Sequence, residues 1–147
     1  MPTPQTASPP ALTPPALTPP DLALVIVAVD DLSAATDFWV ALTGWETTED
    51  APVYRELRAP SGVRLGVYAR TAFVVNLGCD VADLAAGPVA ATEVYLAVDD
   101  VVSTQRRALA LGARLLREVE TKPWGDDVAY VLAPGGLVVA LAAPTGS

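Results

Sequence analysis

Hydrophobic positions along the chain change twice from a strand-like run to a helix-like stripe. Leu24–Leu32 reads LVIVAVDDL, and Glu93–Val101, which begins 69 positions later, reads EVYLAVDDV. Runs of β-branched residues predict strands, and an Asp pair directly before a helical pattern predicts a helix N-cap. We therefore interpret the Asp30-Asp31 and Asp99-Asp100 pairs as caps rather than as paired catalytic carboxylates.

Each Asp pair is followed by apolar residues at helical spacing. The first stripe consists of Leu32, Ala35, Phe38, Trp39 and Leu42, and the weaker second stripe of Val101, Thr104, Ala108 and Leu111. Gly44 and Gly112 then stand where a left-handed residue ends a helix. The pattern predicts two helices, with Phe38 and Trp39 packed in the core.

Three strand-like runs separated by turn residues follow each predicted helix. In the first copy they are Trp45 to Thr48, Val53 to Arg58 and Val63 to Ala69, and in the second Arg114 to Glu120, Asp127 to Leu132 and Leu137 to Ala142. Ala59-Pro60-Ser61-Gly62 and Ala133-Pro134-Gly135-Gly136 predict tight connections before the last strand of each copy. The fold class is therefore α+β, built from two βαβββ modules.

The modules lie between less regular segments. The first twenty residues hold eight of the fourteen prolines and a PPALT repeat, which predicts an extended or disordered arm. The predicted organisation is an arm over 1–20, a first module over 21–69, a linker over 70–91, a second module over 92–143 and a tail over 144–147. Within the linker, Phe73 to Val75 could pack against the modules.

One four-stranded half-barrel sheet leaves a concave face and an edge exposed, so it needs a second half. The two modules of one chain could pair, or each could pair with a module of a second chain in a swapped homodimer. The small size and the Pro-rich arm favour the homodimer.

Composition limits the compartment and the partners. Seventeen acidic and nine basic residues give a net charge of -8, which argues against nucleic acid; this charge could favour a cationic ligand or serve solubility alone. The longest candidate membrane stretch, Leu22–Val29, is far shorter than the roughly 20 residues of a spanning helix. The N-terminus also lacks the basic and apolar regions of a signal peptide. We expect a cytoplasmic protein that binds neither nucleic acid nor membranes.

The sequence contains one cysteine, Cys79, and no histidine. A single cysteine excludes an intrachain disulfide framework. Because no histidine can activate its thiol, we interpret Cys79 as a small buried hydrophobe.

Two segments carry a family likeness. Lys122–Leu141, KPWGDDVAYVLAPGGLVVAL, resembles the second-module signature of the glyoxalase/bleomycin-resistance proteins, the vicinal oxygen chelate superfamily. Val29–Trp45, VDDLSAATDFWVALTGW, resembles the first strand and helix of that superfamily, and the likeness extends over about residues 22 to 143. The resemblance implies two half-barrels that enclose a cleft.

In metal-dependent members of that superfamily, four inward-facing His or Glu side chains hold a cation. The matching positions here are Leu24, Gly66, Glu93 and Ala140, of which only Glu93 carries a donor atom. A divalent metal needs more protein ligands than one. The resemblance therefore implies the metal-free branch, whose best-known members sequester antibiotics, and we expect no metal and no cofactor.

The same substitutions predict a roomy cleft with aromatic walls. Gly66 and Ala140 are small, and alternation along the strands places Tyr68 on the face of Gly66, and Tyr95 on the face of Glu93. Tyr95 and Trp124 match ligand-stacking tryptophans of bleomycin-binding relatives, and Tyr54 matches a further aromatic residue. The predicted ligand-binding residues are Tyr54, Gly66, Tyr68, Glu93, Tyr95, Trp124 and Ala140.

These residues suit sequestration of a small planar aromatic natural product, such as a bleomycin-like peptide, an enediyne or a mitomycin-type quinone. One alternative is a metal-free enzyme with Glu93 as acid or base, because burial would raise the pKa of Glu93; Arg64 is its nearest inward-facing candidate partner. A third possibility is a metalloenzyme with ligands outside the matched positions. We expect binding rather than catalysis, with a small-molecule aromatic ligand and a second copy of the chain as partners.

Overall fold

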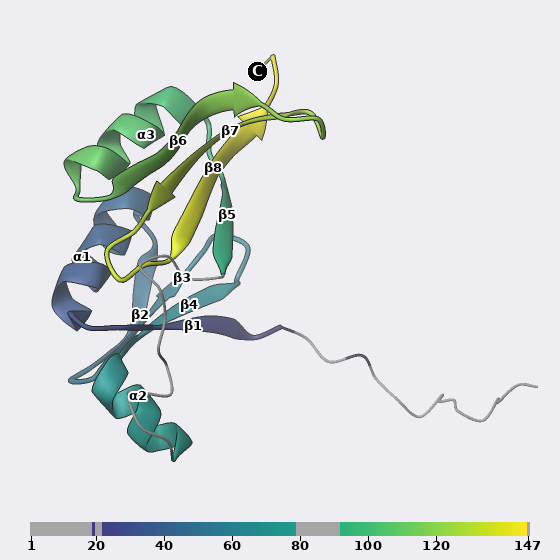
Figure 1. Cartoon of the computed structure of the whole chain (residues 1–147). Helices are drawn as coiled ribbons and strands as arrows, with labels where there is room; N and C mark the ends of the chain where they lie inside the picture. The colour runs from purple at the N-terminus through teal and green to yellow at the C-terminus, as the bar shows by residue number, and fades with distance from the viewer. Residues whose placement is uncertain (1–18, 20–21, 79–91, 147) are drawn as a thin grey trace, which may run out of the picture.

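The repeat predicted from the hydrophobic pattern is present in the computed structural model, which describes residues 19, 22–78 and 92–146 (Figure 1). The first module consists of β1 (Leu24–Val29), α1 (Leu32–Thr43), β2 (Glu46–Ala51), β3 (Tyr54–Arg58) and β4 (Arg64–Ala69). The second consists of β5 (Glu93–Ala97), α3 (Val101–Ala110), β6 (Arg114–Thr121), β7 (Asp126–Leu132) and β8 (Val138–Pro144). This arrangement confirms the α+β class and the two βαβββ modules.

The two sheets have equivalent topologies. Their strand orders are β1-β4-β3-β2 and β5-β8-β7-β6, with the first pair parallel and the other pairs antiparallel. Leu24 lies opposite Arg64 on the neighbouring strand, as Glu93 lies opposite Val138. The sequence repeat is thus a structural repeat, in which β1 and β5 are edge strands.

The second Asp of each pair caps a helix, as the sequence predicts. The side chain of Asp31 accepts a hydrogen bond from the amide of Ala34, and that of Asp100 from the amide of Ser103, each at 3.0 Å. Gly44 ends α1 with a φ of 70°, in the left-handed region that a residue with a Cβ rarely adopts. Local sequence signals thus set the start of both helices and the end of α1.

Most predicted strand bounds agree with the structure to within one residue, and three differences are larger. The range 70–91, predicted as a linker, begins with a further helix, α2 (Arg70–Leu77), which has no clear apolar stripe in the sequence. Strand β2 continues to Ala51 because it pairs with β3 as far as Tyr54, and β8 continues to Pro144. The predicted Pro-rich arm, apart from Pro19, and Cys79 lie outside the described residues.

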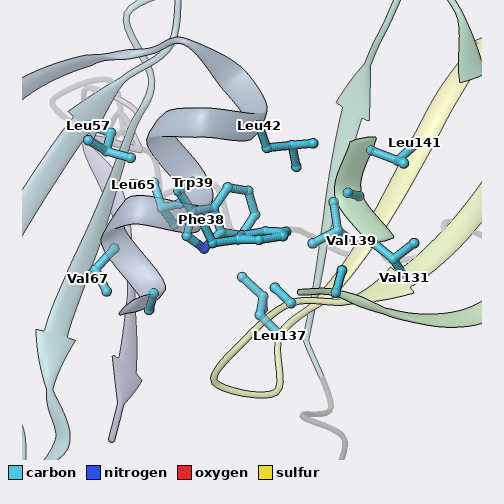
Figure 2. Packing of buried hydrophobic residues seen from close by; sticks show 14 of the residues in the cluster. Phe38, Trp39, Leu42, Leu57, Leu65, Val67, Val131, Leu137, Val139 and Leu141 are labelled. Carbon is cyan, nitrogen blue, oxygen red and sulfur yellow. The ribbon is translucent and has the colours of Figure 1, made fainter. Parts of the chain in front are cut away.

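A single hydrophobic core joins the two modules. Leu57, Leu65 and Val67 enter it from the first sheet, and Val131, Val139 and Leu141 from the second. Phe38 and Trp39 of α1 lie between them, as predicted, with their rings edge to face at a centroid distance of 5.6 Å (Figure 2). The helix-covered faces of the two sheets therefore face the same core.

Because side chains alternate along strands, the other face of each sheet points away from this core. Gly66 lies between the core residues Leu65 and Val67, and Ala140 between Val139 and Leu141. The faces that carry Gly66 and Ala140 thus both point away from the core that the two modules share. We call them the first and the second outer face.

Candidate functional site

The first outer face brings together three of the residues predicted to bind a ligand. Tyr54 on β3 lies opposite Tyr68 on β4, and Gly66 is two positions from Tyr68. The Tyr54 and Tyr68 rings meet edge to face with centroids 5.2 Å apart, and Tyr68 meets Phe73 of α2 at 5.5 Å. Phe73 extends the aromatic surface of this face. The sequence did not predict α2, the helix that carries Phe73.

The structure corrects the prediction that Gly66 opens space in the cleft. A Cβ atom at Gly66 would lie 2.4 Å from the hydroxyl oxygen of Tyr54 and 2.8 Å from its ring carbon Cε1. The Tyr54 ring therefore lies on Gly66 and fills the space that a side chain would take. Gly66 permits this close approach.

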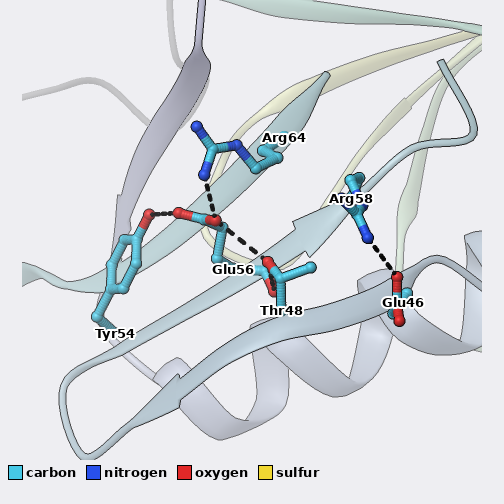
Figure 3. A network of polar contacts seen from close by, with 6 residues as sticks. All are labelled: Glu46, Thr48, Tyr54, Glu56, Arg58 and Arg64. Atoms are coloured by element: carbon cyan, nitrogen blue, oxygen red, sulfur yellow. Dashed lines mark hydrogen bonds and ion pairs between the residues drawn. The ribbon is translucent and has the colours of Figure 1, made fainter. Parts of the chain in front are cut away.

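A buried carboxylate holds Tyr54 in place. Glu56 accepts a hydrogen bond from the Tyr54 hydroxyl at 2.7 Å, from the Thr48 hydroxyl at 3.1 Å and from Arg64 Nη1 at 3.0 Å (Figure 3). The Glu56 side chain is 8% exposed and that of Arg64 37%. Glu56 is not among the residues predicted from the sequence, although alternation along β3 places it on the face of Tyr54.

This network shifts two ionisation equilibria. Burial of Glu56 alone would raise its pKa, but the hydrogen bonds from Tyr54 and Thr48 and the charge of Arg64 outweigh burial and lower that pKa below its ordinary value. Burial, and then the hydrogen bond to Glu56, raise the pKa of Tyr54. Near neutral pH, Glu56 is therefore a carboxylate and Tyr54 a hydrogen-bond donor.

Two expectations about Glu93 do not hold in the single chain. Arg64, predicted as its nearest partner, pairs with Glu56 instead. Glu93 itself is exposed at the start of the edge strand β5, not enclosed by apolar walls. The burial on which an acid–base role for Glu93 depended is therefore missing.

The second outer face carries an exposed pair of aromatic residues. Tyr95 of β5 and Trp124 of the turn before β7 are 45% and 58% exposed. The indole Nε1 of Trp124 donates to the Tyr95 hydroxyl at 2.9 Å, and this hydroxyl donates to Asp126 Oδ2 at 2.5 Å. The hydrogen bond to Asp126 raises the pKa of Tyr95. Both rings are thus fixed in orientation while they remain exposed.

Small and aromatic side chains surround this pair. Ala140 lies opposite Tyr95 on one side and opposite Tyr130 on the other, and packs with Tyr130 in a small apolar cluster of this face. The ammonium nitrogen of Lys122 lies 5.3 Å from the centre of the Tyr130 ring, a cation–π distance. Tyr130 occupies the position equivalent to Glu56, since these residues lie opposite Ala140 and Gly66.

The seven predicted residues therefore form two groups rather than one. Tyr54, Gly66 and Tyr68 lie on the first outer face, and Glu93, Tyr95, Trp124 and Ala140 on the second. We call these groups the first and the second half-site. One chain does not bring the half-sites together.

The residues at the four matched positions do not fit a divalent metal. Leu24, Gly66 and Ala140 offer no side-chain donor atom. Within residues 22–78 and 92–146, no three His, Cys, Asp or Glu side chains are grouped so that they could hold an ion. We derive no chemistry through a metal.

Comparison with known proteins identifies the fold. A model of the glyoxalase-like domain matches residues 24–146. The chain belongs to the glyoxalase-like domain family. This confirms the resemblance to the vicinal oxygen chelate superfamily, whereas no curated protein matches the chain.

Solved structures share this glyoxalase-like fold at low identity. A glyoxalase-related enzyme from Fulvimarina pelagi is 21% identical, with a TM-score of 0.72 over 84% of this chain and 87% of that one. A glyoxalase/bleomycin resistance protein/dioxygenase family enzyme from Burkholderia phytofirmans PsJN is also 21% identical, with a TM-score of 0.74 over 85% and 99%. A lactoylglutathione lyase from Agrobacterium tumefaciens is 20% identical, with a TM-score of 0.64 over 86% and 95%.

Among the described residues, no helix is both long and apolar enough to span a bilayer.

Proposed function

We propose that this glyoxalase-like protein binds and sequesters a small planar aromatic compound, such as an antibiotic or a cytotoxic natural product, without a metal. The observation that carries the proposal is the Tyr95–Trp124 pair, whose exposed rings are held by hydrogen bonds. Contiguous exposed apolar patches often mark binding surfaces, and these two side chains are in contact with each other. Fixed rings lose little conformational entropy when a flat ligand stacks on them.

The proposed site combines two chains. The first half-site contains the half-buried Tyr68 and lies beside the exposed Ile26, and the second contains the exposed Tyr95 and Trp124. Because both half-sites point away from the core of their own chain, we infer that a closed cleft forms between the first half-site of one chain and the second half-site of another. A homodimer would hold two such clefts.

Tryptophan fluorescence tests the binding proposal. The chain has three tryptophans, of which Trp39 is buried and Trp124 exposed. Bleomycin, a mitomycin-type quinone and the tricyclic hydrocarbon fluorene are the probes. We expect at least one probe to quench the emission of the full-length protein, and Trp124→Ala to weaken its binding by roughly tenfold, because one stacked ring pair is lost.

The control is Val102→Ala, which shortens an exposed apolar side chain on α3, outside both half-sites, and should leave affinity unchanged. Equal affinity of Trp124→Ala and the unmodified protein for every probe, measured by calorimetry, would remove the basis of the proposal. Failure of all probes to bind would do the same.

A further inference from the structure

The Arg64–Glu56 pair lies on the first outer face, beside the aromatic residues of the first half-site. Glu56 is almost fully buried, whereas Arg64 keeps more than a third of its side chain exposed. A buried ion pair costs much of its attraction in desolvation, so it adds little to stability by itself. It does fix the orientation of the exposed partner.

The Glu56 carboxylate is buried, and three of its roughly four acceptor positions are already taken, so it offers a ligand little. One oxygen accepts from Tyr54, and the other from Thr48 and Arg64. Tyr54 in turn is pressed against Gly66 and against the Tyr68 ring. Within this network, the polar group that remains accessible to a ligand is the guanidinium of Arg64.

The guanidinium of Arg64 has unused donors. Its one hydrogen-bond partner within residues 22–78 and 92–146 is Glu56, which it contacts through Nη1. A second terminal nitrogen points away from Glu56 in Figure 3. The Nε–H and Nη2–H groups lie along one edge of the planar fork, so one ligand oxygen can accept from both.

The charges around Arg64 determine whether an anionic or a neutral oxygen atom of a ligand fits beside it. Glu56 already balances the positive charge of Arg64, and it would repel a second carboxylate nearby. The chain as a whole carries a net charge of -8, which also disfavours an anion. A neutral acceptor takes the two N–H bonds without either cost.

We propose that Arg64 donates hydrogen bonds from Nε and Nη2 to a ring carbonyl oxygen of the ligand, so that the ligand is an aryl ketone or a quinone. This inference rests on the proposed function, and it narrows the planar aromatic compound to a chemical class. Glu56 is then a positioning residue, because it orients Arg64 and Tyr54 without contacting the ligand.

Three tricyclic probes test the inference with the full-length protein. Fluorenone carries a ring ketone, fluorene has no acceptor, and fluorene-2-carboxylate is an anion. We expect fluorenone to bind roughly tenfold more tightly than fluorene, the effect of one good hydrogen bond to a charged group. Tighter binding of the carboxylate than of fluorenone would overturn the choice of a neutral acceptor.

Substitution of Arg64 assigns the preference to this side chain. Arg64→Met should reduce the fluorenone-to-fluorene ratio to about one and leave fluorene affinity within about twofold. Arg64→Met leaves the buried Glu56 carboxylate without its positively charged partner. The double variant Glu56→Gln/Arg64→Met is therefore measured as well, and it should give the same fluorenone-to-fluorene ratio as Arg64→Met. Arg58→Met is the matched control, since Arg58 lies opposite Arg64 on the same face and pairs with Glu46.

The outcomes separate the inference from the function on which it rests. A preference for fluorenone that survives in both Arg64 variants, or equal binding of fluorenone and fluorene to the unmodified protein, would overturn the role of Arg64 while binding itself stands. Failure of all three probes to bind would count against the proposed function as well.

Discussion

The Tyr54 ring determines whether the absence of a side chain at Gly66 leaves open space in the first half-site. The small size of Gly66 predicts open space, but the Tyr54 ring occupies it and leaves room for no Cβ atom. Strand alternation correctly places Tyr54, Gly66 and Tyr68 on one face. It does not say which neighbour leans over the glycine, because that depends on the hydrogen bond from Tyr54 to Glu56.

The ion-pair partner of Arg64 could not be predicted from the sequence. The strand period places Arg64 on the outer face, but the choice between Glu56 and Glu93 depends on which strand lies next to β4 and on which edge strand stays exposed. Sheet order follows from three-dimensional packing rather than from local pattern. The sheet face on which each of these aromatic residues lies could thus be predicted, and the polar network of the first half-site could not.

The pKa of Glu56 predicts a pH dependence of stability. Its pKa is lowered in the folded protein from an ordinary value of 4.5, so its contribution to the free energy of unfolding is present above pH 4.5 and is lost as the pH falls through the lower folded value. We expect Glu56→Gln to be less stable than the unmodified protein near neutral pH. This difference should shrink in acid.

Urea denaturation between about pH 7 and pH 3 measures this difference. Glu46→Gln is the control, since Glu46 is exposed in its pair with Arg58 and should show little pH-dependent difference. A stability difference for Glu56→Gln that stays constant over the whole range would contradict the assigned role.

At the scale of elements, local signals predicted most of the fold. Both βαβββ units, the caps at Asp31 and Asp100 and the two tight connections are where the sequence places them. Helix α2 was missed because its apolar residues do not form one clear stripe, and it is held by packing of residues such as Phe73 on the first sheet. Tertiary contacts, not periodicity, define that element.

The two Asp pairs allow a matched test of helix capping. Asp100→Ala removes the side chain that accepts from the Ser103 amide, so we expect a loss of about 1 kcal/mol in the free energy of unfolding. Asp99→Ala, one position earlier, should change it by less than about 0.5 kcal/mol. Equal losses for the two variants in urea denaturation would show that charge, rather than the cap, is responsible.

At the scale of the whole molecule, the hydrophobic core shared by the two modules limits how a ligand-binding site can form. The core-facing sides of both sheets meet at Trp39 and its neighbours, so both half-sites point away from the shared core. The sequence left open whether the modules pair within or between chains. The observed arrangement agrees with the proposed pairing of half-sites from two chains.

Complementation between two inactive variants tests this pairing most directly. Tyr68→Ala damages the first half-site, and Trp124→Ala the second. Each variant alone should lack a fluorenone site of normal affinity. After subunit exchange in an equal mixture, half of the dimers contain both variants and each of these has one undamaged cleft, so we expect about one normal-affinity site for every four chains. A mixture that binds no more fluorenone than the separate variants, although native mass spectra show mixed dimers, would contradict a site shared between chains.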